Sequence, residues 1–577
     1  MTLRDSLYEK ISQVIAELAG SLGVPDFSVE VPESIEYGDY ATNVALMLAK
    51  SLGRSPMDIA EELAKKLTDE RWEISVAPPG FLNFRFASTI RAAHIGTIIE
   101  MQDQYGANEL LKGKKVIVEY TDPNPFKEFH IGHLMSNTIG ESISRVVEFS
   151  GAEVKRANYQ GDVGLHVAKA VWAILNKTSL NFKKQVERMN TDKEKAAYFG
   201  LMYAMGAKAS ESDEQTQKEV KEINKKIFDR SDPYINEVYD EGRKSSLAYF
   251  EEIYKLLGTK FDFSFFESKT GEKGKELVSE GLQKGVFEQS DNAIVFRGEK
   301  VGLHTRVFIN SAGLPTYEAK ELGLAVEKYE LYPYDLALVV TGNEIREYFK
   351  VVRAVLQQLR PQLAENLVHI PHGMLRLKSG KMSSRTGDVM RAEDLLVYAR
   401  VELVSRIHEI MSGEKDMWRA ENQKTVEQVA LGAIKYSILR QSAGKDIIFD
   451  FETSLSFYGD SGPYLQYTYA RARSVLRKSD TKGDPTSRNK TIHEDSVALE
   501  RYLLYFPDAV AEALRTYNPH HIANYLFHLS QKFNSFYAHE KIIGSERMLY
   551  SLAVTEAVAI TLKNGLNLLG IETPEEM

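Results

Sequence analysis

Residues 115–134 read KVIVEYTDPNPFKEFHIGHL, and this stretch decides the fold. Its first six residues, Lys115-Val116-Ile117-Val118-Glu119-Tyr120, form a β-branched run that is typical of a buried parallel strand. After a loop, His130-Ile131-Gly132-His133 opens a segment whose apolar spacing predicts a helix over 131–150. A second strand is expected over 153–157. This β-α-β order predicts a Rossmann-like, doubly wound parallel sheet.

Outward from this unit, the chain divides into three predicted domains. Residues 1–110 predict an α+β unit with helices over 3–22, 44–52 and 57–67, an extended piece over 27–31, a loop over 36–43 and a strand over 81–86. After a linker near 111–114, the Rossmann-like domain is expected over 111–445, interrupted by a charged helical insertion at about 175–256. Its strand pattern returns over 293–296, 305–309, 336–340 and 369–370. An all-α helical bundle is expected over 446–577.

The composition excludes several classes of protein. The chain of 577 residues has no cysteine, which excludes disulfides, thiolate nucleophiles and thiolate zinc sites. No apolar run approaches the ~18 residues that a membrane span needs. The N-terminus resembles neither a signal peptide nor a transit peptide, so we expect a cytoplasmic protein without membrane attachment. The net charge of −9 argues mildly against a nucleic-acid partner, although phosphate contact requires only a basic face.

The first motif predicts half of an ATP site. It lies where a strand ends and a helix begins, and open α/β sheets bind ligands at the carboxyl ends of strands. The helix N-terminus offers unpaired N–H groups to a phosphate. His130 and His133 are one i, i+3 step apart, so both can face the same phosphate. Gly132 would let a flat base approach the backbone. Alone, such histidines would usually be ordinary surface residues.

A second loop, about 250 residues downstream along the printed sequence, reverses that expectation. It reads KSGKMSSRTG over 378–387, is bracketed by glycines, and carries Lys381, Ser383 and Arg385. Such a loop can close over a polyphosphate and stabilise charge on the leaving pyrophosphate. We add Met374 to the predicted ATP-binding residues. A carboxylate that attacks the α-phosphorus of ATP needs no general base, so we expect no dedicated metal site, with Mg²⁺ carried by the nucleotide.

The two motifs together resemble class I aminoacyl-tRNA synthetases, and their surroundings resemble the arginyl-tRNA synthetase family over essentially the whole chain. The resemblance rests on segments spread over all three predicted domains, namely 38–43, 79–83, 123–134, 158–164, 459–467, 513–515 and 533–537, together with the terminal Met577. It implies ATP-dependent ligation of L-arginine to tRNA(Arg) through an arginyl-adenylate that forms only when tRNA is bound. It also implies an N-terminal domain that contacts the tRNA elbow, an anticodon-binding C-terminal bundle, and a monomer.

The arginine pocket is predicted on two grounds. Tyr317 and Glu321 are four residues apart in an expected helix, so ring and carboxylate share a face suited to one guanidinium. The resemblance implies the same two residues, with Glu321 in place of the family's usual aspartate. It also implies Asn124 and His133 as ligands of arginine, and Asn343 where the family often has glutamine.

The resemblance implies further functional residues. The common class I loop has a second lysine where this chain has Ser384, and Lys127 is the implied substitute, with Arg385 as a further source of charge. For tRNA, we expect Phe81 and Asn83 of the N-terminal domain and Tyr464 and Tyr537 of the bundle to stack on or hydrogen-bond to bases. For Phe81 and Tyr537, a place in the core is an equally good interpretation.

Three alternatives remain beside this interpretation. A glutamyl-type synthetase would need a cationic pocket, which Glu321 beside Tyr317 does not favour, and a cysteinyl enzyme should have zinc-binding cysteines. A small-molecule nucleotidylyltransferase can share the His-x-Gly-His turn but needs neither flanking domain. A non-catalytic tRNA-binding paralogue has no reason to retain His130, His133, Lys127 and Lys381.

Overall fold

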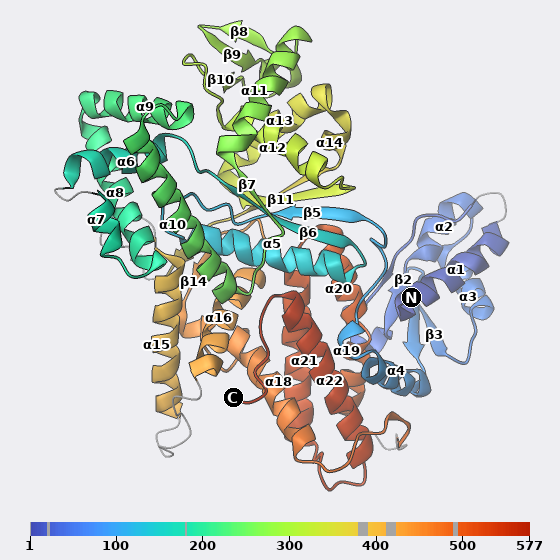
Figure 1. The fold of residues 1–577 in the computed structure, drawn as a ribbon. Coiled ribbons are helices and arrows are strands. Elements are labelled where there is room, and N and C mark those ends of the chain that lie inside the picture. The colour runs from blue at the N-terminus through green and yellow to red at the C-terminus, as the bar shows by residue number, and fades with distance from the viewer. Residues whose placement is uncertain (1, 20–22, 179–181, 379–389, 411–422, 488–493) are drawn as a thin grey trace.

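A parallel sheet lies at the centre of the molecule (Figure 1). The computed structural model describes residues 2–19, 23–178, 182–378, 390–410, 423–487 and 494–577. The order of the five strands is β12-β11-β5-β6-β7, and each neighbouring pair runs parallel. The strands are β5 (Lys115–Glu119), β6 (Glu153–Gln160), β7 (Phe263–Phe266), β11 (Leu336–Gly342) and β12 (Leu367–His372). The predicted doubly wound sheet is confirmed.

Helices bury both faces of this sheet. Val116 and Val118 of β5 pack with α5 (Ile131–Phe149), whereas Ile117 packs into a separate core on the other face. Because side chains alternate across a strand, a strand covered on both faces reads as an unbroken apolar run. The helices of the second face are α11 (Glu267–Gln283), α12 (Tyr317–Leu331), α13 (Arg346–Leu359) and α14 (Pro361–Glu365).

The insertion after β6 is helical, as expected, and has its own hydrophobic core. It comprises α6 (Leu165–Lys177), α7 (Phe182–Glu187), α8 (Asp192–Ser212), α9 (Glu214–Asp229) and α10 (Pro233–Leu257). The strands expected over 293–296 and 305–309 form, but they lie outside the central sheet. They are β9 (Ala293–Phe296) and β10 (Arg306–Ile309), which join β8 (Glu288–Ser290) in a small antiparallel sheet. Periodicity identifies a strand but not its partner, so this placement required the structure.

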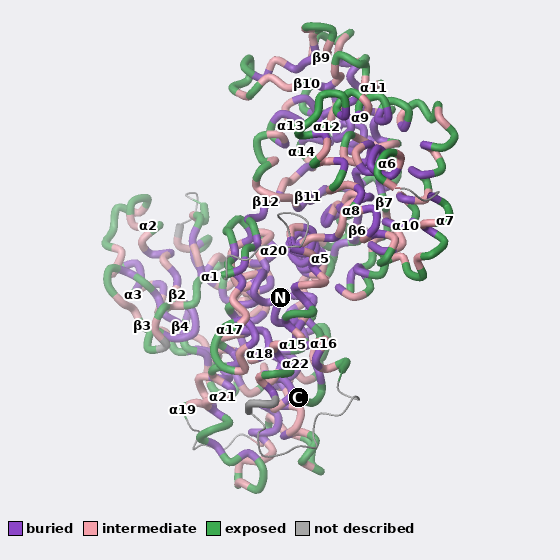
Figure 2. The backbone as a smooth tube through the Cα atoms, turned by 90° about the vertical axis from the view of Figure 1, so that its left-hand side faces the viewer, coloured by how far each residue is buried: buried purple, intermediate pink, exposed green. Residues whose placement is uncertain are grey.

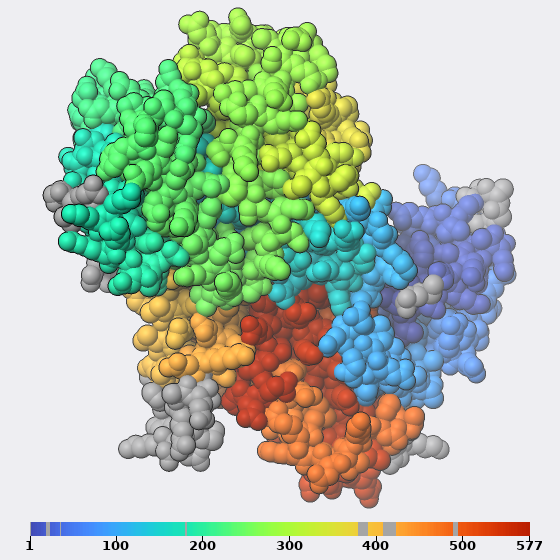
Figure 3. All heavy atoms as spheres, viewed as in Figure 1, coloured from blue at the N-terminus to red at the C-terminus, as the bar shows by residue number. Residues whose placement is uncertain are grey.

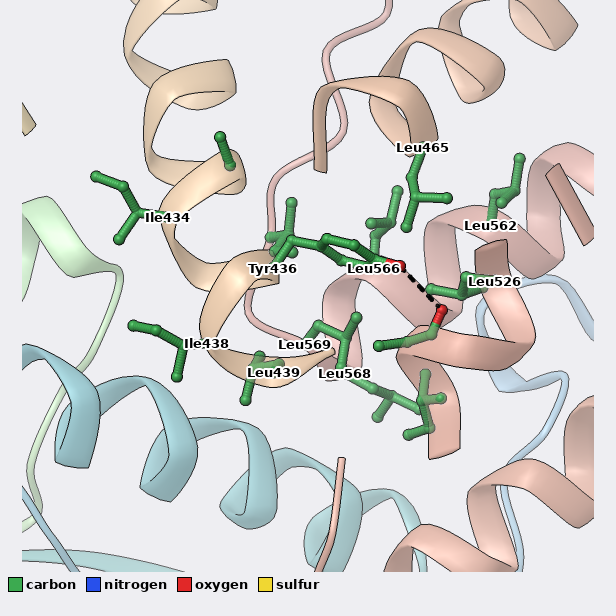
Figure 4. Packing of buried hydrophobic residues seen from close by; sticks show 14 of the residues in the cluster. Ile434, Tyr436, Ile438, Leu439, Leu465, Leu526, Leu562, Leu566, Leu568 and Leu569 are labelled. Carbon is green, nitrogen blue, oxygen red and sulfur yellow. Dashed lines mark hydrogen bonds between the residues drawn. The ribbon is translucent and has the colours of Figure 1, made fainter. Parts of the chain in front are cut away.

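The C-terminal helices share one continuous core with α5 and the sheet. In Figure 4, Tyr436 lies among leucines of three other helices, and its hydroxyl is 3.4 Å from the carbonyl oxygen of Ala523. The expected all-α bundle is confirmed. The elements after the sheet are β13 (Leu375–Leu377), α15 (Ala392–Ile410), α16 (Gln423–Leu439), β14 (Ile447–Phe449), α17 (Phe451–Ser454), α18 (Gly462–Arg477), α19 (Glu494–Leu503), α20 (Phe506–Thr516), α21 (His520–His539) and α22 (Met548–Leu568).

The N-terminal unit forms a lobe at one side of the molecule (Figure 3). It is an antiparallel sheet in the order β1-β2-β4-β3, packed with helices around its own core. Two strands were missed from the sequence, because β2 lies in the expected loop and the residues of β3 were left unassigned. The elements are α1 (Leu3–Ala19), β1 (Val29–Glu30), β2 (Tyr40–Thr42), α2 (Val44–Leu52), α3 (Pro56–Lys66), β3 (Trp72–Ala77), β4 (Phe81–Phe86) and α4 (Ser88–Met101).

Buried charges join this lobe to the C-terminal helices. Asp39 is fully buried, accepts a hydrogen bond from the Phe86 N–H, and pairs with Arg501. The guanidinium of Arg91 lies 3.2 Å from a carboxylate oxygen of Glu500. In Figure 2, buried residues run through the interior of each unit, whereas the outward faces of α3 and α7 are largely exposed. Deleting residues 1–110 would leave Arg501 and Glu500 buried without these partners, so point substitutions are the better test of this lobe.

We expect Tyr40→Phe to weaken the contact between the N-terminal lobe and the C-terminal helices. The buried Tyr40 hydroxyl donates to Asp508 at 2.8 Å, and burial raises the pKa of Asp508 to about 6 while this hydrogen bond lowers it. Losing a hydrogen bond to a charged group costs about 1.5–3 kcal/mol of unfolding free energy. Asp508 is ionised above its folded pKa, so the cost should appear at pH 8 and shrink as the pH falls through about 6. Urea unfolding at both pH values measures this, with the exposed Tyr37→Phe as control. Equal costs at both would contradict the argument.

Candidate active site

A crevice is expected where the strand order reverses, between the carboxyl ends of β5 and β11. The chain leaves β5 toward β6 and β7 on one side, and it returns through β11 on the other. The N-terminus of α5 follows β5, and a short 3₁₀ turn (Asn343–Ile345) follows β11. The predicted residues from both parts of the sequence are therefore arranged around one edge of the sheet.

His130 and His133 build the start of α5. The Nδ1 atom of His130 accepts from the N–H groups of Gly132 and His133 at 3.1 and 3.4 Å. In return, the His130 N–H donates to Nδ1 of His133 at 3.2 Å. The two rings stack with their centroids 3.6 Å apart. Because both Nδ1 atoms accept, each neutral ring carries its proton on Nε2 and can donate it to a ligand.

Electrostatics keep both histidines neutral. Burial, with a contribution from the Lys127 charge, lowers the pKa of His130 to about 4. The pKa of His133 lies well below its ordinary value because the ring is buried beside His130 and Lys127. Gly132 has a local role as well, since a Cβ there would lie 3.0 Å from the His130 ring. At neutral pH the pair therefore offers two neutral donors, with positive charge supplied from elsewhere.

The residues directly after the second loop contact the first motif. Lys381, Ser383 and Arg385 fall in residues 379–389, which lie outside the described residues. The residues that follow pair with the histidine turn, because the Ile131 N–H donates to the Met390 carbonyl at 3.1 Å and Arg391 forms a β-bridge with His130. On the other side, the Lys378 ammonium is 2.6 Å from Asp450.

Lys127 lies in the loop before the histidine turn, and Met374 lies directly before β13. Lys127 is partly buried, and its ammonium is 4.8 Å from the centroid of the Tyr203 ring on α8. Its charge acts on both histidines, as their lowered pKa values indicate. Met374 is half exposed, and Asp446 fixes its backbone N–H at 2.8 Å. Lys127 is thus a cation close to the predicted phosphate position.

Tyr317 and Glu321 share one side of α12 but differ in depth. Tyr317 is 62% exposed, whereas Glu321 is 8% exposed. The hydroxyl of Tyr348 links them, because it donates to the Tyr317 carbonyl at 3.0 Å and lies 3.5 Å from the Glu321 carboxylate. The helix therefore presents an accessible ring above a buried acid, as a pocket for a guanidinium requires.

Further carboxylates surround Glu321, and these were missed from the sequence. Glu119 ends β5 and is paired with the buried Lys328 at 2.7 Å, while Asp122 accepts from the Tyr159 N–H at 2.8 Å. Burial, followed by the charge of Glu119, raises the pKa of Glu321 to about 8 and that of Asp122 well above its ordinary value. The sequence did carry one signal for this cluster, because Glu119 is a charged residue at the end of an apolar strand. These carboxyl groups outnumber the one ammonium, that of Lys328, that acts on both Glu321 and Asp122, so the cluster favours a cation.

Asn124 and Asn343 approach the same edge of the sheet. The Asn124 amide oxygen lies where a Cβ at Gly161 would be, at 2.2 Å, so glycine is required for this contact. The Asn343 amide oxygen is buried and has no hydrogen-bond partner among the residues that the structure describes. An unpaired buried acceptor is costly, and a ligand N–H could satisfy it.

The four residues predicted to bind tRNA have very different exposures. Asn83 is 5% exposed and lies in the middle of its sheet, opposite Ala41 and Ser75, whereas Phe81 is 36% exposed. Tyr464 is partly buried, and its hydroxyl accepts from Asn534 at 3.0 Å. Tyr537 is 42% exposed.

Tyr537 lines a cavity of about 660 Å³ on the C-terminal helices. The Arg471 guanidinium lies over two rings there, 4.7 Å from the centroid of Tyr467 and 5.1 Å from that of Tyr537. The lining includes four basic and two aromatic side chains beside aliphatic residues and two glutamates, namely Arg471, Arg477, Lys478, Lys541, Tyr467, Tyr537, Glu540 and Glu576. Such a surface suits unstacked bases and phosphates.

Known families match the chain in three consecutive parts. The arginyl tRNA synthetase N-terminal domain matches residues 5–86, and the class I (R) tRNA synthetase catalytic domain matches residues 94–451. The DALR anticodon-binding domain matches residues 465–577. The chain belongs to the arginyl-tRNA synthetase family. The expectation from the two motifs is confirmed at the level of the family.

Individual members of the arginyl-tRNA synthetase family agree over their full length. The arginine–tRNA ligase of Treponema pallidum is 32% identical, with 98% of each chain covered. That of Treponema denticola is 30% identical, covering all of this chain and 99% of its own. Among solved structures, Thermus thermophilus arginyl-tRNA synthetase superimposes with a TM-score of 0.80 at 26% identity, with both chains fully covered.

Proposed function

We propose that this chain attaches L-arginine to tRNA(Arg) at the expense of ATP. In the first step, a carboxylate oxygen of arginine bonds to the α-phosphorus, the bond to the bridging oxygen breaks, and pyrophosphate leaves. In the second step, a ribose hydroxyl of the tRNA attacks the carbonyl carbon of the adenylate, and AMP leaves. Neither step needs a protein nucleophile, so catalysis rests on positioning and charge stabilisation.

The acid-rich pocket beside the histidine turn carries this proposal. Glu119, Asp122 and Glu321 face one buried cation, Lys328, at the edge of the sheet that includes the end of β5. A glutamyl-type enzyme would need the opposite charge in this pocket. A purely tRNA-binding paralogue would not require a pocket of this charge beside an ATP site.

We assign roles by position. His130 and His133 donate from Nε2 to ATP phosphates, Lys127 and the loop residues Lys381, Ser383 and Arg385 stabilise the leaving pyrophosphate, and Gly132 and Met374 border the nucleotide. Asn124 and His133 hold the amino and carboxylate groups of arginine. Tyr317, Glu321 and Asn343 hold its side chain. The placement of Asn124, Asn343 and Glu321 at one edge of the sheet supports these roles.

The flanking units are proposed to hold tRNA. We assign residues 1–110 to the elbow of tRNA, residues 111–445 to catalysis, and residues 446–577 to the anticodon. The basic and aromatic cavity around Tyr537 supports the last assignment. Phe81, Asn83 and Tyr464 are proposed contacts, and Phe81 is the more exposed of the first two.

Cofactor, assembly and location complete the proposal. Mg²⁺ is proposed to enter with ATP, held mainly by phosphate oxygens. The enzyme is proposed to act as a monomer in the cytoplasm. None of the described helices is long and apolar enough to cross a membrane.

Aminoacylation tests the function directly. The full chain is incubated with ATP, Mg²⁺, tRNA(Arg) and each amino acid in turn, and charged tRNA is measured. We expect charging with arginine alone. Charging with glutamate, or formation of an adenylate with a non-amino-acid carboxylate, would contradict the proposal.

We expect arginine binding to weaken as the pH falls below about 8. The guanidinium pairs with ionised Glu321, whose pKa in the ligand-free enzyme is about 8, so a proton must leave before arginine can bind. The apparent dissociation constant should rise about tenfold for each pH unit below that value, since one unit is worth about 1.4 kcal/mol. Calorimetric titration from pH 6 to 9 measures this. The slope should disappear in Glu321→Gln, and a wild-type constant independent of pH would refute the linkage.

We expect Tyr537→Ala to weaken tRNA binding by about 5- to 150-fold. Truncating an aromatic ring on which a base stacks costs about 1–3 kcal/mol. Filter binding of tRNA(Arg) at fixed salt measures the loss, and the Michaelis constant for arginine should not change. Tyr458→Ala is the control, because that ring is 79% exposed and lies outside the cavity. If both variants bind tRNA equally well, the cavity is not an RNA contact.

A further inference from the structure

Lys328 is the most deeply buried cation near the proposed arginine pocket. Its side chain and that of Glu119 are each 2% exposed, and the ammonium lies 2.7 Å from the Glu119 carboxylate. The two residues are 209 positions apart in the sequence. A buried charge of this kind is tolerated only when it is paired, so Lys328 fixes the position of Glu119 at the end of β5.

Depth increases along one side of α12. Tyr317, Glu321 and Lys328 follow one another at steps of four and seven residues, so they share a face of the helix. Tyr317 is 62% exposed, Glu321 is 8% exposed and Lys328 is 1% exposed. A guanidinium that enters past the ring therefore reaches Glu321 before it reaches Lys328.

The charges around Lys328 do not balance. The acidic groups that act on Lys328 or on Glu321 are Glu119 and Asp122 from the end of β5, Glu321 on α12 and Glu267 on α11. Tyr334 also faces Lys328, and Tyr348 faces Glu321. Lys320 is a second cation, but it pairs with Glu267 at 2.5 Å. After these two pairs form, Glu321 and Asp122 remain without a cationic partner among the described residues.

We propose that Lys328 is a positioning residue for arginine recognition, which holds the Glu119 carboxylate in place so that Glu119 and Glu321 together receive the guanidinium. This inference rests on the proposed function. Lys328 engages one carboxylate oxygen of Glu119 and leaves the other for the substrate. Without the ammonium, the buried Glu119 carboxylate would lose the partner that fixes its orientation at the end of β5.

Lys328→Met tests this role, because methionine keeps the length of the side chain and removes the charge. At pH 8.5 we expect the dissociation constant for arginine to rise at least tenfold. The Michaelis constant for ATP and the affinity for tRNA should not change. Lys328→Arg keeps the charge and should show a smaller loss. A loss for arginine that is as large in Lys328→Arg as in Lys328→Met would count against a role of the charge and overturn the proposal.

The Glu119→Gln background sharpens the test. There, Lys328 has lost its partner and should pair with Glu321 or repel the guanidinium. Lys328→Met should therefore improve arginine binding, or leave it unchanged, in Glu119→Gln, although it weakens binding in the wild type. Weakening in both backgrounds would overturn the proposal. Thermal unfolding of each variant verifies folding, and a wild-type enzyme that does not bind arginine would contradict the proposed function rather than this inference.

Discussion

Lys127→Ala is expected to depress arginine activation by roughly 10²–10³-fold, the loss typical of removing one preorganised charge-stabilising group. The class I loop usually has a second lysine where this chain has Ser384, so the site has one cation fewer for the leaving pyrophosphate. Lys127 is partly buried, close enough to lower the pKa of both motif histidines, and rests on the Tyr203 ring. It lies three residues before His130, in the loop that leads into the histidine turn.

ATP–pyrophosphate exchange measures this effect, with and without tRNA(Arg), because the family resemblance implies activation only when tRNA is bound. ATP binding should change much less than the rate, since the charge develops in the transition state. Lys177→Ala is a matched control, because Lys177 also lies over an aromatic ring, Trp172, but far along α6 from the histidine turn. If Lys127→Ala kept full activity, Arg385 would be the better candidate for stabilising charge on the leaving pyrophosphate. Robust exchange without tRNA would contradict the coupling and not the enzyme's identity.

Glu321→Gln is expected to raise the Michaelis constant for arginine by at least about tenfold, while that for ATP hardly moves. Glutamine keeps the shape but removes the charge from a side chain that is 8% exposed. Losing one partner of a buried charged pair typically costs about 2–5 kcal/mol. The comparison is best made near pH 8.5, where wild-type Glu321 is ionised, since its pKa is about 8.

Glu327→Gln is the control for this prediction. Glu327 lies on the same helix but is only partly buried and faces Lys269 and Lys273. Its substitution should leave both Michaelis constants unchanged. An unchanged arginine constant in Glu321→Gln would remove Glu321 from the pocket and leave Glu119 as the carboxylate for the guanidinium.

The local sequence was sufficient to predict much of the central fold. The apolar run of β5 and the helical spacing after His130 predicted a strand and a helix that form with boundaries close to those expected. The reason is physical: a strand buried on both faces and a helix N-terminus each require residue types at fixed short spacings. The two motifs also predicted one ATP site built from two distant loops. The pairing of Met390 and Arg391 with the histidine turn supports this prediction.

Contacts between distant residues required the tertiary structure. Glu119 and Lys328, 209 residues apart, form the pair that determines the charge of the proposed arginine pocket, and no spacing in the sequence reveals it. The same holds for Asp39, which pairs with Arg501 across two domains, and for β9 and β10, which form their own sheet. Periodicity specifies which side of a helix or strand is buried. The element that covers that side depends on how the whole chain packs. The sequence alone thus determined the family and the ATP motifs, and only packing decided which buried carboxylates and cations share the pocket.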